Sequence, residues 1–214
     1  MKIKISPSVL NNFNRFLDES IEYFDYEKFM DTLTKPIEVS DKMRFGSACH
    51  KVLELGNDAF NPGYDNCVMI DNLPIYIAQD KVDVLIKFRN DYGEGIYEQR
   101  HRKVYQVGKY EVVMSMIIDM ITSSGSIFDF KFVQSQIKSE QYLNSMQWKC
   151  YVDAMDLDHF IYWIWTNRKN DLVQFPPIVC FRTKKTHLEI VMMIERFIEF
   201  LENEDLIHLF LFNE

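Results

Sequence analysis

Residues 117–131, with the sequence IIDMITSSGSIFDFK, predict a β-hairpin that carries one carboxylate on each arm. The isoleucines before the turn favour a strand, TSSGS supplies the turn, and residues 127–132 form the second strand. A turn centred on Ser124 puts Asp119 directly opposite Asp129. The phenylalanines that alternate with the acid on the second arm give that strand an apolar face, which is expected to pack inward.

The two facing carboxylates predict a cation site. Cross-strand partners lie roughly 4.5–5.5 Å apart at Cβ, and like charges at that spacing repel each other. A divalent cation between Asp119 and Asp129 turns the repulsion into a binding site. Lys131 lies two residues beyond Asp129 and shares its strand face. Two acids and a lysine at one place suit metal-assisted phosphodiester hydrolysis, and the alternative is a surface hairpin with solvated charges.

The composition is that of one soluble globular domain. The chain has 214 residues, 47% of them hydrophobic, which is enough for one substantial core. We expect a single domain over residues 1–214, with N-terminal helices in about 6–56, a catalytic core in about 95–182 and an amphipathic C-terminal helix in about 185–203. The net charge of −8 argues against broad non-specific affinity for nucleic acid, but a carboxylate site is acidic until a metal binds.

Three features that the sequence lacks indicate the cellular compartment of the protein and the oxidation state of its cysteines. No segment approaches the length of a transmembrane helix, and the charged N-terminus does not resemble a signal peptide, so we expect no membrane association. The four cysteines are scattered without a CxxC pair. They predict free thiols in a reducing cytoplasm and neither a zinc site nor an iron–sulfur cluster.

The order of predicted elements indicates a mixed α/β domain. Helices are expected from Pro7 behind a Ser6 N-cap, at about 45–55 with Gly56 as a stop, and at about 81–90, 140–155 and 185–203. Strands are expected at about 95–105 and 110–121, in the acidic hairpin, from Phe160, and after the prolines that precede IVCFR. Residues 57–80 are expected to form a loop with short strands.

Four motifs in this order resemble the PD-(D/E)XK nuclease superfamily, in its RecB/RecE-like and λ-exonuclease-like branch. The first is MRFGSACHKVLE, in which a glycine precedes His50 by four and a glutamate follows. The second and third, IIDMI and IFDFK, resemble the paired core strands with the D-x-K sequence. QWKCY, with Gln147 and Tyr151 four apart, resembles the QxxxY motif of the branch. The chain departs from the family at Met116, where a small residue is usual.

The resemblance implies an α/β (α+β) fold with a restriction-endonuclease-like core, in which helices flank a mixed central sheet. It implies a metal-dependent DNA exonuclease of the phage or prophage recombination type, in the cytoplasm of a bacterial or phage-infected cell. Duplex DNA ends are the expected substrate, and a single-strand annealing protein and further copies of the chain are compatible partners. The alternatives are a structure-specific or single-strand endonuclease of the same fold and a DNA-binding module without catalysis.

The same resemblance assigns a metal site and a catalytic lysine. Asp119 and Asp129 would ligate one or two Mg²⁺ or Mn²⁺ ions, which prefer oxygen donors. The backbone carbonyl of Phe130 would be a further ligand, and His50 would complete the shell. Lys131 would orient or deprotonate the attacking water or stabilise developing charge, with its pKa depressed by nearby metal ions.

Further residues of the motifs receive roles around this centre. Gln147 and Tyr151 would position a backbone or scissile phosphate by neutral hydrogen bonds. Glu98, on the strand before the hairpin, would be an additional metal ligand, or it would form a salt bridge with Arg100. Glu54 would hold the His50 imidazole in place, or it would be a solvated acid on the helix surface.

Overall fold

The computed structural model describes residues 1–18, 21, 24–134, 136–168 and 171–212. Seven strands form one mixed sheet: β1 (Lys2–Ile5), β4 (Gly95–Val107), β5 (Tyr110–Thr122), β6 (Ile127–Val133), β7 (His159–Arg168), β8 (Asp171–Gln174) and β9 (Ile178–Phe181). The strand order is β1-β5-β6-β7-β8, with β4 paired to β5 and β9 paired to β7. A separate hairpin joins β2 (Cys67–Ile70) and β3 (Leu73–Tyr76).

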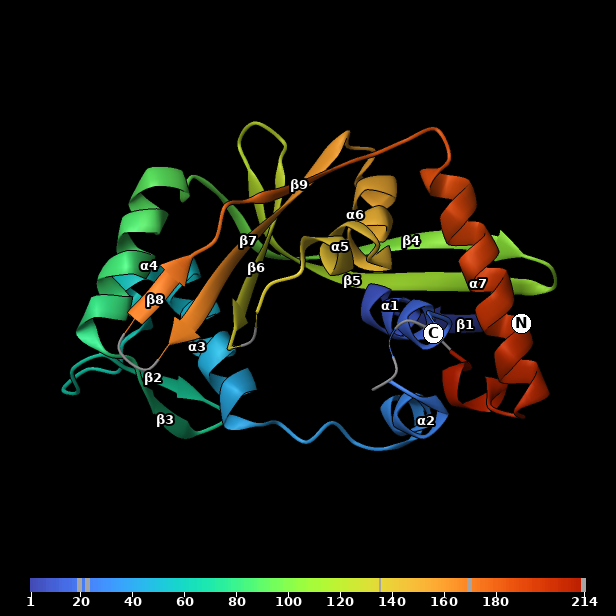
Figure 1. Cartoon of the computed structure of the whole chain (residues 1–214), viewed down its shortest axis with the longest axis horizontal. Helices are drawn as coiled ribbons and strands as arrows, with labels where there is room; N and C mark the ends of the chain where they lie inside the picture. Colours follow the sequence, from blue (N-terminus) through green and yellow to red (C-terminus); the bar gives the residue numbers. More distant parts are fainter. Residues whose placement is uncertain (19–20, 22–23, 135, 169–170, 213–214) are drawn as a thin grey trace.

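Helices flank this sheet at both ends of the molecule (Figure 1). They are α1 (Pro7–Phe16), α2 (Tyr26–Thr34), α3 (Asp41–Leu55), α4 (Gln79–Tyr92), α5 (Ser139–Leu143), α6 (Met146–Met155) and α7 (Thr186–Asn203), with short 3-10 turns η1 (Gly56–Ala59) and η2 (Ile207–Phe210). The mixed sheet with flanking helices confirms the predicted fold class. Within the described ranges, no helix is both long and apolar enough to cross a membrane.

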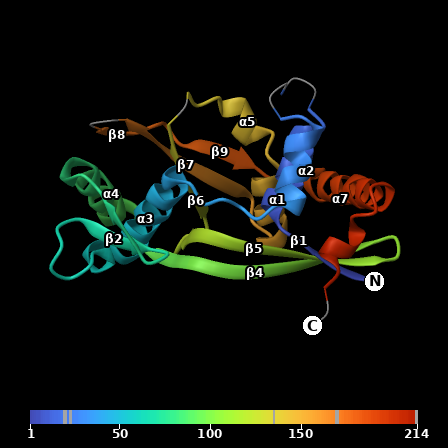
Figure 2. The same ribbon diagram turned by 90° about the horizontal axis from the view of Figure 1, so that it is seen from below.

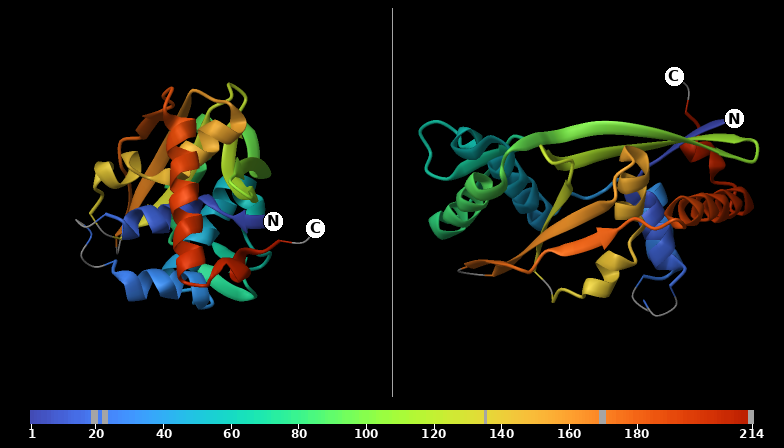
Figure 3. Two further views of the ribbon diagram at one scale, coloured as in Figure 1. Left: turned by 90° about the vertical axis from the view of Figure 1, so that its right-hand side faces the viewer. Right: turned by 90° about the horizontal axis from the view of Figure 1, so that it is seen from above.

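Two apolar cores lie on opposite sides of β6 and β7. One core packs α1, α6 and α7 against the sheet, and the other packs α3 and α4 against it. Figure 2 shows α3 and α4 at one end and α1, α2 and α7 at the other, with β4 and β5 running between the two groups. In Figure 3, α7 covers the end away from α3 and α4. Phe128 and Phe130 join the α3–α4 core while Ile127 joins the other, so alternate residues of β6 serve opposite cores.

The predicted hairpin is confirmed together with its register. Met120 pairs with Phe128 and Ile121 with Ile127, so the turn is centred on Ser124. Continuing this register by one residue brings Asp119 level with Asp129 on the neighbouring strand. β7 then pairs with β6 in parallel, after a crossover through α5 and α6. Because of this crossover, α6 lies close enough to β6 for its Gln147 to contact Asp129.

Several boundaries differ from the prediction. α3 begins at Asp41 because the Ser40 hydroxyl accepts the Met43 amide, which caps the helix four residues earlier than expected. The helix predicted at about 140–155 is two helices, and the Ser145 hydroxyl accepts the Gln147 amide at the start of α6. The structure also contains β1, α2 and β8, which the sequence did not predict. β1 has only four residues and is stabilised by parallel pairing with β5.

Candidate active site

β5 and β6 separate where the two acids lie. The last paired residues are Met120 and Phe128. Beyond them the Phe130 amide donates to Asp119 Oδ2 over 2.8 Å, so a carboxylate takes the place of a strand carbonyl. The side chain of Asp119 therefore lies between the diverging strands, with 16% of it exposed. Burial raises the pKa of Asp119, although the Lys131 charge and the Phe130 hydrogen bond oppose that shift.

Asp129 is the most enclosed acid of the group. It is 3% exposed, and Lys131 Nζ lies 2.6 Å from its Oδ2. Gln147 Nε2 donates to Oδ1 over 2.9 Å. Apart from the Lys131 ion pair, Oδ2 has no hydrogen-bond partner among the described residues. Burial raises the pKa of Asp129 to about 6. The Lys131 ammonium compensates part of the cost of burying this carboxylate.

The pKa of Lys131 is raised by its two acidic neighbours, and the depressed pKa expected beside bound metal ions stays a prediction. Burial lowers its pKa, but the charges of Asp129 and Asp119 outweigh that effect and raise the pKa above the ordinary lysine value. The expectation rested on nearby metal cations. Without those charges the two carboxylates determine the local potential, and the ammonium form is favoured.

His50 reaches the same centre from α3. Its Nε2 lies 3.0 Å from the Phe130 carbonyl, and its Nδ1 lies 3.6 Å from Asp119 Oδ2. A carbonyl can only accept, so the geometry assigns the proton to Nε2 and leaves a lone pair on Nδ1. Burial lowers the pKa of His50 to about 4, which keeps the ring neutral near pH 7. The Phe130 carbonyl oxygen has a second lone pair, so it can accept this hydrogen bond and still serve as a metal ligand.

Glu98 reaches the centre through an unusual backbone conformation. It lies inside β4 with a φ of 50°, a left-handed value that is uncommon for a residue with a side chain. Oxygen or nitrogen atoms of His50, Glu98 and Asp119 all lie within 4.8 Å of one another. Within the described residues, no ion pair joins Glu98 to Arg100 within 4.0 Å. Burial and the Asp119 charge raise the pKa of Glu98.

Gln147 and Tyr151 form hydrogen bonds with the two strands that carry the acids. Gln147 donates to Asp129, as described above, and the Tyr151 hydroxyl donates to the Ile117 carbonyl over 2.7 Å. Both side chains project from α6 toward the diverging strands. Glu54 lines the adjacent cleft, but both ring nitrogens of His50 face other partners, Phe130 and Asp119.

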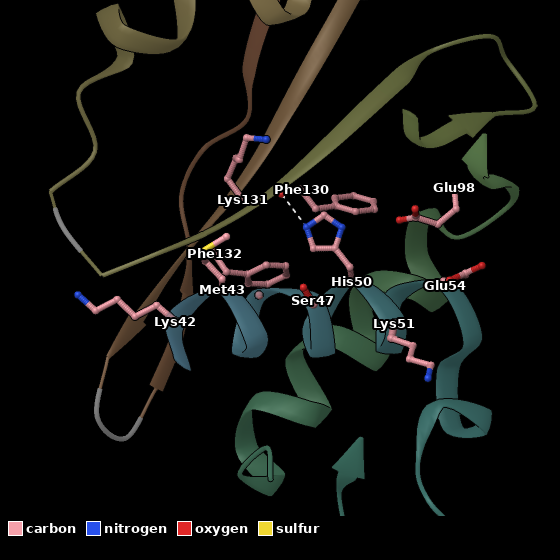
Figure 4. A pocket seen from close by; sticks show the side chains of 11 residues that line it. Lys42, Met43, Ser47, His50, Lys51, Glu54, Glu98, Phe130, Lys131 and Phe132 are labelled. Atoms are coloured by element: carbon pink, nitrogen blue, oxygen red, sulfur yellow. Dashed lines mark hydrogen bonds between the residues drawn. The ribbon is translucent and has the colours of Figure 1, made fainter. Parts of the chain in front are cut away.

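Of these groups, His50, Glu54, Glu98 and Lys131 line a cleft of about 780 Å³ between α3 and β6 (Figure 4). Its lining consists of Lys42, Met43, Gly46, Ser47, His50, Lys51, Glu54, Glu98, Phe130, Lys131 and Phe132. Sequence reasoning did not assign a role to Lys42 or Ser47. The signal that could have found Lys42 is its spacing, since it precedes His50 by eight residues, close to two helical turns, on the same helix face.

Comparison with known proteins supports the assignment of the fold but not of an activity. No family model matches the sequence, and no curated protein matches it. Among solved structures, a putative exonuclease from Eubacterium rectale is similar with a TM-score of 0.53 and 13% identity over 92% of this chain and 79% of that one. The alkaline exonuclease LHK-Exo from Laribacter hongkongensis gives 0.50 and 13% over 94% and 89%. Its complex with dAMP gives 0.51 and 14% over the same shares.

This chain shares its fold with these solved exonuclease structures. The predicted resemblance to the PD-(D/E)XK nucleases is confirmed at that level. Identities of 13–14% do not carry activity from one protein to the other. The function must therefore be argued from the side chains of the site.

Proposed function

We propose that this protein is a metal-dependent deoxyribonuclease that hydrolyses phosphodiester bonds at DNA ends. The observation that carries the proposal is the meeting of Asp119, Asp129 and Lys131 where β5 and β6 separate, beside His50 and Glu98. Three acids, a neutral imidazole and an ammonium group suit phosphodiester hydrolysis assisted by a divalent cation.

The donor set fits a hard divalent cation. Asp119, Glu98 and Asp129 offer carboxylate oxygens, and the Oδ2 atom of Asp129 is buried with the Lys131 ammonium 2.6 Å away. His50 offers the lone pair of Nδ1. These donors suit Mg²⁺ or Mn²⁺, and the imidazole favours Mn²⁺ somewhat. When bound, such an ion acidifies a coordinated water and neutralises charge on the phosphate.

The protein residues would hold and orient the reacting groups. Lys131, protonated in its ion pair with Asp129, would stabilise negative charge on the phosphate. Alternatively, once a cation neutralised the acids, it would release its own proton to solvent and then accept a proton from the attacking water. Gln147 would keep Asp129 oriented toward the centre. Tyr151 would fix the course of β5 through the Ile117 carbonyl, and a direct contact of either side chain with phosphate remains part of this proposal.

The wider assignment rests on the resemblance of the motifs. It comprises an exonuclease of phage or prophage recombination built on residues 1–214 as one domain, working with a single-strand annealing protein or as a homo-oligomer. An endonuclease of the same fold would use the same residues. A binding module without turnover would not require the acid–acid–lysine set, so the intact set favours an enzyme.

An end-labelled duplex incubated with Mg²⁺, Mn²⁺ or EDTA tests the proposal. Mononucleotide release that depends on the metal would support an exonuclease. Internal cuts would indicate the endonuclease, and retention of uncut DNA would indicate the binding module. Absence of both cutting and binding with every metal would contradict the nuclease assignment.

A further inference from the structure

Gly46 lies inside α3, where neither packing nor backbone conformation requires a glycine. A Cβ atom added there would meet nothing within 4 Å, and the φ of Gly46 is not in the left-handed region. Glycine inside a helix is unfavourable relative to alanine, because it loses more backbone freedom on folding. The residue lines the cleft that also contains His50. The close approach of a ligand to the helix backbone is one physical reason for a glycine at such a position.

The neighbours of Gly46 indicate which kind of ligand approaches. Lys42, Gly46 and His50 follow one another at intervals of four residues, so they share one face of α3. Lys42 is exposed, and within the described residues its ammonium has no acid within 4.0 Å. Figure 4 shows Lys42 at the end of the cleft away from Glu98. An ammonium without an ion pair beside an open helix backbone suits a phosphate.

The dimensions of the cleft favour one nucleic-acid strand. Eight residues of helix separate Lys42 from His50 by ~12 Å along the axis, so a ligand that touches both must be extended. The volume of about 780 Å³ lies in the range of pockets that hold a single small ligand. A space of that size accommodates a short stretch of one strand.

We propose that one DNA strand runs along the cleft face of α3, with its backbone against Gly46 and a phosphate on Lys42. This inference rests on the proposed nuclease function and assigns Lys42, Gly46 and Ser47 as positioning residues. The Ser47 hydroxyl, exposed beside Gly46, would donate to the same backbone. The exposed Met43 and the half-buried Phe132 would meet the bases.

The test compares Gly46→Ala, Lys42→Ala and a matched control, Lys87→Ala. Lys87 is an exposed lysine on α4 that does not line the cleft. Binding of a short end-labelled single-stranded oligonucleotide is measured against salt in Ca²⁺, cleavage is measured in Mg²⁺ or Mn²⁺, and Tm is measured without DNA. Gly46→Ala should raise Tm by about 2–4 °C, since alanine is the better helix residue, yet weaken binding by about tenfold or more.

Lys42→Ala should weaken binding by about tenfold and reduce the slope of log affinity against log salt by about one, while Lys87→Ala leaves both unchanged. If the wild type cuts DNA but Gly46→Ala and Lys42→Ala bind and cut like Lys87→Ala, the strand path is wrong and the nuclease assignment stands. If Gly46→Ala does not fold, Lys42→Ala decides alone through its salt slope. If the wild type neither binds nor cuts DNA, both proposals fail.

Discussion

Gln147 donates a hydrogen bond from its side-chain amide to Asp129 Oδ1 over 2.9 Å, although the two residues belong to different elements, α6 and β6. Through this bond the crossover helix α6 would orient Asp129 in the proposed metal site without contributing a ligand. A hydrogen bond donated to the charged form of a carboxylate lowers the pKa of that carboxylate. Burial acts in the opposite direction and raises the pKa of Asp129 to about 6.

Gln147→Ala should therefore make metal binding more sensitive to acid. In the wild type, protons compete with the metal for Asp129 at and below about pH 6, where affinity should begin to fall. Loss of the hydrogen bond raises the pKa of Asp129 further, so the fall should begin about one pH unit higher, as expected for a bond to a charged group. Mn²⁺ titrations across pH 5–8 measure this. Gln141→Ala, on the neighbouring α5, is the control, and an unshifted profile for Gln147→Ala would count against the orienting role.

Asp119→Asn should remove metal binding while leaving the fold intact. The asparagine keeps an oxygen that can accept the Phe130 amide, so the divergence of β5 and β6 is preserved. Mg²⁺ or Mn²⁺ at 100 times its Kd should stabilise the wild type by about 2.7 kcal/mol through binding to the native state. The variant should lose that increase in Tm together with nuclease activity. Metal-dependent cleavage at the wild-type rate in this variant would exclude Asp119 as a ligand.

The sequence predicted the parts of this site that depend on local periodicity. Alternation of residues around Ser124 determined the hairpin register, and helical spacing put His50 on a helix and Gln147 level with Tyr151. These features depend on neighbours within a few residues, which a single sequence contains. The approach of His50 to Phe130 depends on how α3 packs on β6, and only the family resemblance suggested it.

Glu98 illustrates what local patterns cannot supply. The direction of its side chain, toward His50 and Asp119 rather than toward Arg100, goes with a backbone φ of 50°. No residue propensity predicts that value for a glutamate within a strand. The direction of the Lys131 pKa shift without metal depends on a balance between burial and two carboxylates, which the sequence does not contain. Such balances follow from distances in three dimensions rather than from sequence spacing.

Asp153 predicts a second pH dependence, of stability rather than metal binding. This α6 carboxylate is 1% exposed and accepts hydrogen bonds from Tyr105 and His187, with Arg182 3.3 Å away. Burial alone would raise its pKa, but these partners and Lys103 lower it overall. The native state therefore favours the charged form. The resulting stability is complete well above the unfolded pKa of about 3.9 and is lost as pH falls through the lower native pKa.

Asp153→Asn should reduce the free energy of unfolding at pH 7 by about 1–3 kcal/mol, because its buried donors lose a charged acceptor. It should also weaken the decline in stability below about pH 4, where the wild-type carboxylate becomes protonated. Urea unfolding at pH 3, 4, 5 and 7 measures both effects. The exposed Asp156→Asn, which loses one surface pair with Arg182, is the matched control. A parallel loss at every pH would mean that Asp153 acts through packing alone.

Lys131→Ala separates chemistry from binding at the proposed active site. Lys131 Nζ lies 2.6 Å from Asp129 Oδ2 and 32% of its side chain is exposed, so the ammonium can reach both a metal ligand and a phosphate in the cleft. A general-base or electrostatic role contributes about 10²–10⁴-fold to turnover, so single-turnover cleavage in Mg²⁺ should fall by that factor. Affinity for DNA ends in Ca²⁺ should change much less, because one phosphate contact among several is lost.

The Lys131→Ala change also removes the partner of a buried acid. The pKa of Asp129 should rise beyond its value of about 6, since the Lys131 charge now lowers it. Part of any loss at pH 7 could then arise from weaker metal binding, so cleavage must be measured at saturating metal and repeated at pH 8.5. A defect that persists under both conditions assigns Lys131 to the chemical step. Cleavage at a near-normal rate once metal and DNA are saturating would make it a docking residue, and the catalytic set would reduce to its metal ligands.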